Sequence, residues 1–127
     1  QFIIEPLVEA GIKLIHHCDG DIRSLAQDFL DLGFSGLQGF QYELGVSIAE
    51  LRQLKTIGGE PPLIWAGLSV STTLPFGSIE EVEAEVGGFV EATEGRGLFL
   101  FTSNVTGVEV PPDNIRAGYA RAERPLR

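Results

Sequence analysis

The chain has 127 residues and a formal net charge of -9, from 18 acidic and nine basic side chains. Hydrophobic residues make up 43% of it and charged residues 21%, the ordinary balance of a soluble globular domain. An acidic surface repels phosphate backbones and anionic lipids, and no apolar run approaches the roughly 20 residues that cross a bilayer. Neither nucleic acid nor a membrane is therefore expected as a partner.

Cysteine content and the first residues bear on location. A single cysteine, Cys18, cannot form an internal disulfide, which suits a reducing compartment. The start, from Gln1 to Pro6, lacks the basic and cleavable pattern of a secretory signal. These features predict a cytoplasmic protein. The sequence contains no methionine, so we expect a chain trimmed or cut from something longer.

In the first half of the chain, apolar spacing predicts helices that alternate with short apolar strands. A helix tail ends at Gly11, and Asp21 is the expected cap of a second helix that ends at Gly33. Ser47 and Glu50 predict a capping box for a third helix. The expected strands are 12–16 and 34–40, and the expected helices are 2–10, 21–32 and 48–57.

The second half repeats the alternation with stronger signals. Ser78 and Glu81 predict another capping box, and the helix that follows keeps apolar residues at helical spacing to about Ala92. The last helix is expected from Asp113, with Ile115, Tyr119 and Ala122 on one side. The expected strands are 63–66 and 98–101, with long loops at 67–77 and 102–112.

Strands that are apolar on both faces and alternate with helices belong in a parallel sheet covered by helices. The pattern therefore predicts a single α/β domain, 1–127, of four βα units. Two architectures fit this pattern. One is an open doubly wound sheet, and the other is half of a TIM (β/α)8 barrel, which normally needs about 250 residues. Periodicity does not separate them.

Four stretches together resemble the C-terminal half of the uroporphyrinogen decarboxylase superfamily, which includes corrinoid-linked and zinc methyltransferases. Leu74 to Val86 is similar to its Gly-[Ser/Thr]-x-Glu-Glu-Val helix start, and Val110 to Ile115 resembles its Pro-Pro-Glu-Asn segment. His17-Cys18-Asp19-Gly20 resembles its strand-end His-x-[Cys/Asp]-Gly. Leu51 to Lys55, followed by Gly58, resembles its Leu-Lys helix. The order and spacing cover nearly the whole chain, so the resemblance implies the last four units of a TIM barrel.

The resemblance places candidate site residues at the end of the first strand. Zinc methyltransferases of the superfamily use a His-x-Cys pair there with a distant third ligand. Anchoring the motif on Gly20 pairs His17 with Asp19, whereas an alternative register makes Cys18 a ligand. Residues two apart on a strand share a face, so His17 and Asp19 can point together. His16 then faces the other side, as a histidine packed under a helix.

The remaining expected site positions are polar residues after later strands. The second catalytic position of the family falls on Asn104, a poor zinc ligand beside imidazole and thiolate. Gln41 and Ser69 are the expected substrate-binding residues. Ser47 and Ser69 stand where relatives often carry carboxylates. Zinc is therefore possible but lacks a complete ligand set in one chain.

Two functions follow from the resemblance. The first is decarboxylase or corrinoid-linked methyltransferase chemistry on a small-molecule substrate. In it His17 is a metal ligand or proton donor, Asp19 is its partner or the second ligand, and Gln41 and Asn104 lie nearby. The alternative is a non-catalytic half-barrel remnant that self-associates or binds a small molecule. Because a half-barrel leaves two open strand edges, a homodimer that completes the barrel is expected.

Overall fold

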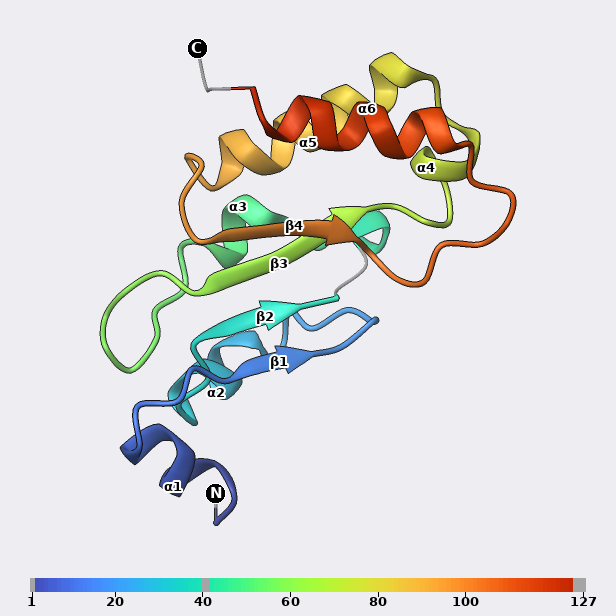
Figure 1. Cartoon of the computed structure of the whole chain (residues 1–127). Coiled ribbons are helices and arrows are strands. Elements are labelled where there is room, and N and C mark those ends of the chain that lie inside the picture. Colours follow the sequence, from blue (N-terminus) through green and yellow to red (C-terminus); the bar gives the residue numbers. More distant parts are fainter. Residues whose placement is uncertain (1, 40–41, 125–127) are drawn as a thin grey trace. The chain divides into compact units, whose positions relative to one another are not determined.

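A four-stranded, all-parallel sheet forms the centre of the fold, which confirms the predicted α/β class with parallel strands. The computed structural model describes residues 2–39 and 42–124. The hydrogen-bonded strand order is β1-β2-β3-β4, without a reversal (Figure 1). The strands are β1 (Ile15–His17), β2 (Gly36–Gln38), β3 (Leu63–Leu68) and β4 (Leu98–Thr102).

Helices connect these strands, and most of the helical residues lie in the second half of the chain. The two longest, α5 and α6, both follow β3 along the chain. The helices are α1 (Ile4–Glu9), α2 (Ala26–Asp31), α3 (Ile48–Leu51), α4 (Thr73–Phe76), α5 (Ile79–Ala92) and α6 (Pro112–Ala122), with a 3-10 turn η1 (Tyr42–Leu44). Within the described ranges, no helix is long and apolar enough to span a membrane.

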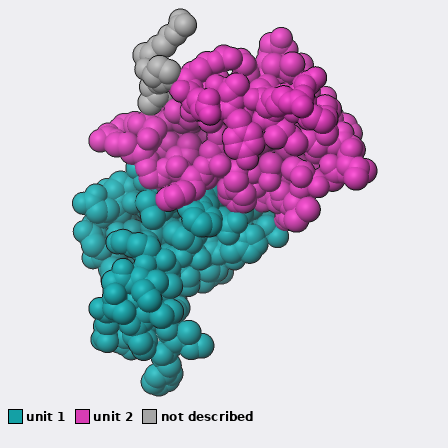
Figure 2. All heavy atoms as spheres, viewed as in Figure 1, with its two compact units in different colours: residues 1–65 teal, residues 66–127 magenta. Residues whose placement is uncertain are grey.

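The chain divides into two compact units at the middle of β3: unit 1 is residues 1–65 and unit 2 is residues 66–127 (Figure 2). The amino-terminal half of β3 pairs with β2, within unit 1. Its carboxyl-terminal half lies against β4, within unit 2, where the Ser103 N–H donates to the Leu68 carbonyl at 2.9 Å. The expectation of a single domain stays a prediction.

The two faces of the unit 1 sheet differ in burial. His16, Leu37 and Ile64 are in register and therefore share one face. Leu37 and Ile64 are fully buried, and the His16 ring stacks on Phe29 of α2 with 3.5 Å between the ring centroids. This face is the helix-covered one. The opposite face carries His17, Gln38 and Trp65, all half-buried or exposed.

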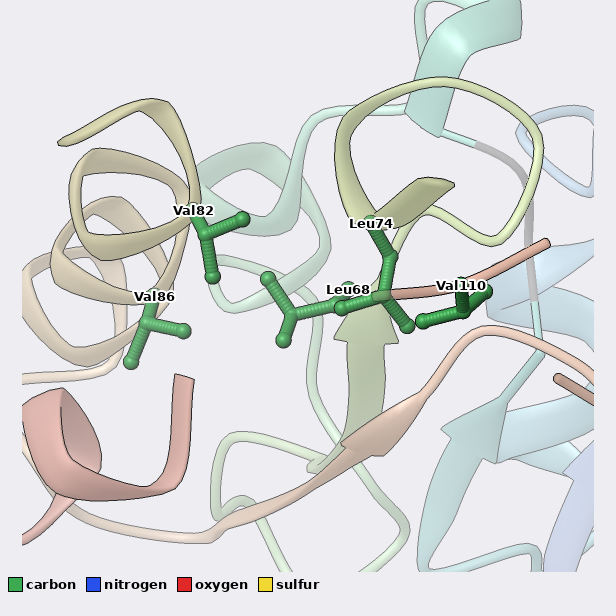
Figure 3. Packing of buried hydrophobic residues seen from close by; sticks show 5 residues of the cluster. All are labelled: Leu68, Leu74, Val82, Val86 and Val110. Atoms are coloured by element: carbon green, nitrogen blue, oxygen red, sulfur yellow. The ribbon is translucent and has the colours of Figure 1, made fainter. Parts of the chain in front are cut away.

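Unit 2 contains a tight aliphatic core between its strands and its long helices. Leu68 of β3 points toward Val82 and Val86 of α5, and Leu74 of α4 and Val110 complete the cluster (Figure 3). Each such side chain contributes about 1.5–3 kcal/mol on burial. Helix α6 packs closely because its Gly118 is buried against Leu68, where a Cβ would lie 2.5 Å from Leu68 Cδ1.

The sequence predicts α5, β4 and α6 of unit 2 well, whereas the elements of unit 1 are shorter than predicted. Helix α5 spans Ile79–Ala92 and begins with the predicted capping box: Glu81 N–H donates to Ser78 Oγ, and Ser78 N–H to Glu81 Oε2. Strand β4 and helix α6 lie within one residue of expectation. The expected loop at 67–77 instead completes β3 and contains α4.

In unit 1, β1 and β2 contain three residues each, and α3 ends at Leu51. Strand β1 starts later than predicted and includes His17, because its register with β2 begins at the pair Ile15–Gly36. Strand β2 ends where Gly39 adopts a positive φ of 89°. Ser47 Oγ accepts the Glu50 N–H at 3.3 Å, so the predicted N-cap of α3 forms.

The prediction that Asp21 caps the second helix is wrong. Helix α2 begins at Ala26, and the Asp21 carboxylate instead accepts from the backbone N–H of Arg23 at 3.0 Å and from its guanidinium. This contact between Asp21 and Arg23 closes a tight turn, so the helix begins later along the chain than predicted. As a consequence Leu25 lies directly before the helix and is exposed, whereas Ile22 is buried.

Candidate functional site

The side chains of His17 and Asp19 meet at the carboxyl end of β1. His17 is the last residue of the strand, and its Nε2 lies 3.5 Å from Asp19 Oδ1. Both side chains are about half exposed, at 54% and 50%. Residues two apart at a strand end point to the same side, so the sequence prediction that these two face together agrees with this geometry. Both groups are therefore accessible to solvent and to a bound molecule.

Gly39, at the end of β2, is a residue of this site that sequence reasoning did not single out. A Cβ on Gly39 would lie 2.6 Å from His17 Nδ1 and 3.3 Å from Asp19 Oδ1. Its φ of 89° is also a conformation that L side chains rarely adopt. Gly39 therefore leaves the space in which the imidazole lies. A signal existed in the sequence, since a glycine directly after a parallel strand often marks a close approach.

Cys18, between the two, points into its own turn. Its Sγ accepts the backbone N–H of Gly20 at 3.4 Å, and its own N–H donates to the Gln38 carbonyl at 3.0 Å. The thiol is half-buried. The backbone hydrogen bond to Gln38 fixes the turn after β1 against the end of β2. It therefore fixes the backbone from which the His17 and Asp19 side chains extend.

The donor atoms do not fit a catalytic zinc ion. Such a site uses three protein ligands and leaves one position open. His17 and Asp19 supply two, and the alternative register brings in Cys18, whose thiol lies in its own turn. Among residues 2–39 and 42–124, no group of three or more His, Cys, Asp or Glu side chains is placed to hold a metal ion.

His16 lies on the opposite face and is packed as predicted. Its ring stacks on Phe29 and meets Phe34 edge-on, with centroids 5.5 Å apart. Its Nδ1 is buried without a hydrogen-bond partner. Burial lowers the pKa of His16 below 6.5, and the neighbouring charge of His17 lowers it further. His16 is therefore a neutral packing residue that anchors β1 to α2, directly behind His17.

Asp21 and Arg23 brace the loop after β1. The Arg23 guanidinium donates to Asp21 at 2.6 Å and also reaches the carbonyls of Leu44 and Gly45, each at 3.4 Å. The side-chain hydrogen bond from Arg23 lowers the pKa of Asp21 from 3.8 to about 2. The pair thus connects the loop that carries Asp19 to the loop after β2.

Ser69, expected to bind substrate, lies in unit 2 directly after β3 and is fully buried. Its Oγ accepts from the N–H groups of Ser71 and Thr72 and from Thr72 Oγ1, at 2.8–3.3 Å. Its own N–H donates to Glu85 Oε1 at 2.8 Å. These bonds shape the turn that leads into α4, so the hydroxyl is enclosed by its own loop.

Asn104, the expected second catalytic position, lies in the loop after β4 in unit 2 and is exposed. Its Oδ1 accepts the N–H of Val105 at 2.7 Å, and its carbonyl accepts Thr102 Oγ1 at 2.8 Å. The amide oxygen of Asn104 is therefore used to form its own loop. Gln41, the other expected substrate-binding residue, lies outside the described residues.

Comparison of the sequence with known protein families and with curated proteins found no match in either search. The geometry of the site therefore supplies the argument for function.

Proposed function

We propose that the chain supplies four consecutive βα units of a (β/α)8 barrel of the uroporphyrinogen decarboxylase type. The strand order supports this. Doubly wound sheets reverse their order at a switch point, whereas barrel strands run consecutively, as β1 to β4 do. The difference between the two faces of the unit 1 sheet also supports the proposal. Barrel helices cover only the outer face of the sheet and leave the inner face to side chains, here such as His17 and Trp65.

The observation that carries the function is the His17–Asp19 contact at the carboxyl end of β1, the end at which barrel enzymes bind substrates. In this proposal the pair performs acid–base chemistry on a small substrate. Loss of CO2 leaves an electron pair on the substrate carbon, which must receive a proton. The imidazolium of His17 donates that proton, and the Asp19 carboxylate, 3.5 Å from Nε2, stabilises the charged ring before transfer.

The same pair also suits methyl transfer to a thiol. There the neutral imidazole of His17 accepts the thiol proton, and Asp19 stabilises the imidazolium that forms. Arg23 keeps the loop that carries Asp19 in place through Asp21 and the Leu44 carbonyl. Gly39 leaves the imidazole the space to occupy this position.

The test is a pair of reactions on the purified chain. CO2 release is followed from carboxyl-labelled uroporphyrinogen, and methyl transfer is followed from methylcobalamin to a small thiol. Loss of a general acid or base is expected to slow the reaction by about 10²–10⁴-fold in His17→Ala, with a smaller loss in Asp19→Asn. Asp31→Asn, an exposed carboxylate on α2, is the matched control. Rates that are equal in the wild type and His17→Ala contradict the proposal.

A second candidate, a barrel remnant that binds a small molecule without catalysis, is favoured by a separate observation. The Ser69 hydroxyl and the Asn104 amide oxygen are both used to form their own loops. In that case the His17 ring signals in an NMR spectrum shift when uroporphyrinogen is added, yet neither reaction proceeds. Turnover that depends on His17 excludes this candidate.

A further inference from the structure

Gln38 lies beside His17 on the open face of the unit 1 sheet. It is the last residue of β2, and it is in register with His17 of β1 on one side and with Trp65 of β3 on the other. Register partners of parallel strands point to the same face, and neighbouring strands lie about 4.8 Å apart. The Gln38 side chain therefore extends from the sheet directly next to the imidazole of the proposed site.

Backbone hydrogen bonds on both sides hold Gln38 at this position. Its carbonyl accepts the Cys18 N–H at 3.0 Å, and the N–H of the next residue, Gly39, donates to the Trp65 carbonyl at 3.4 Å. The end of β2 is thus joined both to the turn after β1 and to β3. A side chain on a strand that is paired on both sides is placed more precisely than a side chain on a loop, and a residue that orients a ligand needs this precision.

The Gln38 side chain forms no hydrogen bond with any other residue in the ranges 2–39 and 42–124, although the residue is half-buried. A primary amide carries two N–H donors and one carbonyl acceptor, and polar groups that are taken out of water are normally paired. On the same face, His17 and Asp19 already contact each other. The Gln38 amide is therefore available to a bound molecule.

The sheet face next to this row is apolar. Two residues before it, Ile15 and Leu63 stand on either side of Gly36 and in register with it. A Cβ on Gly36 would lie 2.7 Å from Leu63 Cβ and 2.9 Å from Ile15 Cδ1, so these two side chains close over the glycine. A molecule bound beside His17 thus meets hydrocarbon on this side, and a directional contact such as the Gln38 amide is needed to fix its orientation.

We propose that Gln38 is a substrate-binding residue that orients the substrate against His17; this rests on the proposed function. The side-chain Nε2 of Gln38 donates a hydrogen bond to a carboxylate oxygen of the substrate, and the reacting carbon then lies next to the imidazole. Because the amide does not titrate, it takes no part in proton transfer. Gln38 should therefore determine KM, whereas His17 determines kcat.

The test compares Gln38→Met with the wild type, both in turnover and in direct binding of uroporphyrinogen. Methionine keeps the length of the side chain and removes the amide. Binding is followed by the fluorescence of Trp65, the single tryptophan and the register partner of Gln38. Loss of a hydrogen bond to a charged group should raise KM and Kd about tenfold to a hundredfold, with kcat within about threefold of the wild type.

Further variants separate the amide contact from other effects. Gln38→Glu brings a carboxylate against that of the substrate and should weaken binding more than Gln38→Met does. Gln38→Asn keeps the amide on a shorter side chain and should recover part of the lost affinity. Gln53→Met, which alters an exposed amide after α3, is the matched control and should leave KM and Kd unchanged. His17→Ala should show the opposite division, a lower kcat with a Kd close to that of the wild type.

Equal KM and Kd in the wild type and Gln38→Met would overturn the assignment, as would a fall in kcat at unchanged KM. A wild type that does not bind uroporphyrinogen would also overturn it. These outcomes are distinguishable from failure of the proposed function. Binding that depends on Gln38 without any turnover would leave the assignment standing and contradict the function, whereas turnover that depends on His17 but not on Gln38 would do the reverse.

Discussion

Unit 1 and unit 2 each contain parallel strands and helices, yet they are built differently. The helices of unit 1 contain four to six residues, and those of unit 2 include one of 14 and one of 11. Unit 2 packs Leu68, Leu74 and Val82 into one aliphatic cluster. Unit 1 holds the His17–Asp19 pair on a sheet face that is half open. Both units therefore bury apolar side chains, but unit 2 builds its core on longer helices, and unit 1 carries the exposed His17–Asp19 pair.

The largest expected effect is on the core of unit 2. Leu74→Ala should lower the free energy of unfolding by about 2–5 kcal/mol, because it removes a fully buried side chain and leaves a cavity. Urea unfolding is followed by circular dichroism and by the fluorescence of Trp65, the single tryptophan, which lies in unit 1. If the units unfold together, both signals shift equally. A shift in circular dichroism alone would show that unit 2 unfolds independently.

The next effect is on the polar contact that fastens α6. Asn114 is buried, and its Nδ2 donates to the carbonyls of Leu74 and Gly77, each at 2.9 Å. Asn114→Ala should destabilise by about 1–3 kcal/mol, since both carbonyls lose their donor. Asn114→Asp should cost at least as much, because a carboxylate cannot donate. Equal stability of wild type and Asn114→Ala, measured by urea unfolding, would contradict the assigned role.

Substituting one glycine in each unit is expected to change stability in opposite directions. Gly39→Ala should destabilise by about 1 kcal/mol or more, because φ is 89° and the new Cβ would meet the His17 ring. Gly88→Ala, in the middle of α5 with nothing within 4 Å, should stabilise by about 0.5–1 kcal/mol. Thermal unfolding measures both, and the NMR signals of the His17 ring should move only in Gly39→Ala. Effects of the same sign would contradict this contrast.

A smaller effect depends on pH through His16. Because its folded pKa lies below the unfolded value of 6.5, the unfolded chain binds more protons as pH falls below that value. The contribution of neutral His16 is therefore complete above pH 6.5 and is lost as pH decreases toward the folded pKa. Unfolding midpoints at pH 7.5 and 5.5 should differ less in His16→Phe, which retains the stack on Phe29. An identical pH dependence in both proteins would argue against a buried neutral ring.

The smallest effect concerns the loop brace. NMR titration of the Asp21 carboxyl should give a pKa of about 2, returning toward 3.8 in Arg23→Gln. Since the folded pKa is the lower one, the contact stabilises above pH 3.8 and is lost as pH falls through 2. In the same variant, the ring signals of His17 should report any movement of the loop that carries Asp19. An Asp21 pKa near 3.8 in the wild type would contradict the contact between Asp21 and Arg23.

Sequence reasoning placed α5, β4 and α6 of unit 2 well because their signals are local, but it missed α4. A capping box at Ser78 and Glu81, followed by apolar residues at helical spacing over the 14 residues of α5, locates this helix without reference to the rest of the chain. In unit 1 the same reasoning misplaced the start of α2, because the Asp21–Arg23 contact competes with helix capping. It also missed Gly39, whose importance depends on a side chain from another strand.

The order of apolar residues, turns and caps by itself determined that four strands alternate with helices and that polar groups gather after the first strand. Such features depend on residues a few positions apart, so they can be predicted from the sequence. Only the tertiary structure decided which side chains meet: that His17 contacts Asp19 above Gly39, and that the Ser69 hydroxyl is enclosed in its own turn. Those contacts depend on strand register and close backbone approach, which join residues far apart in the sequence.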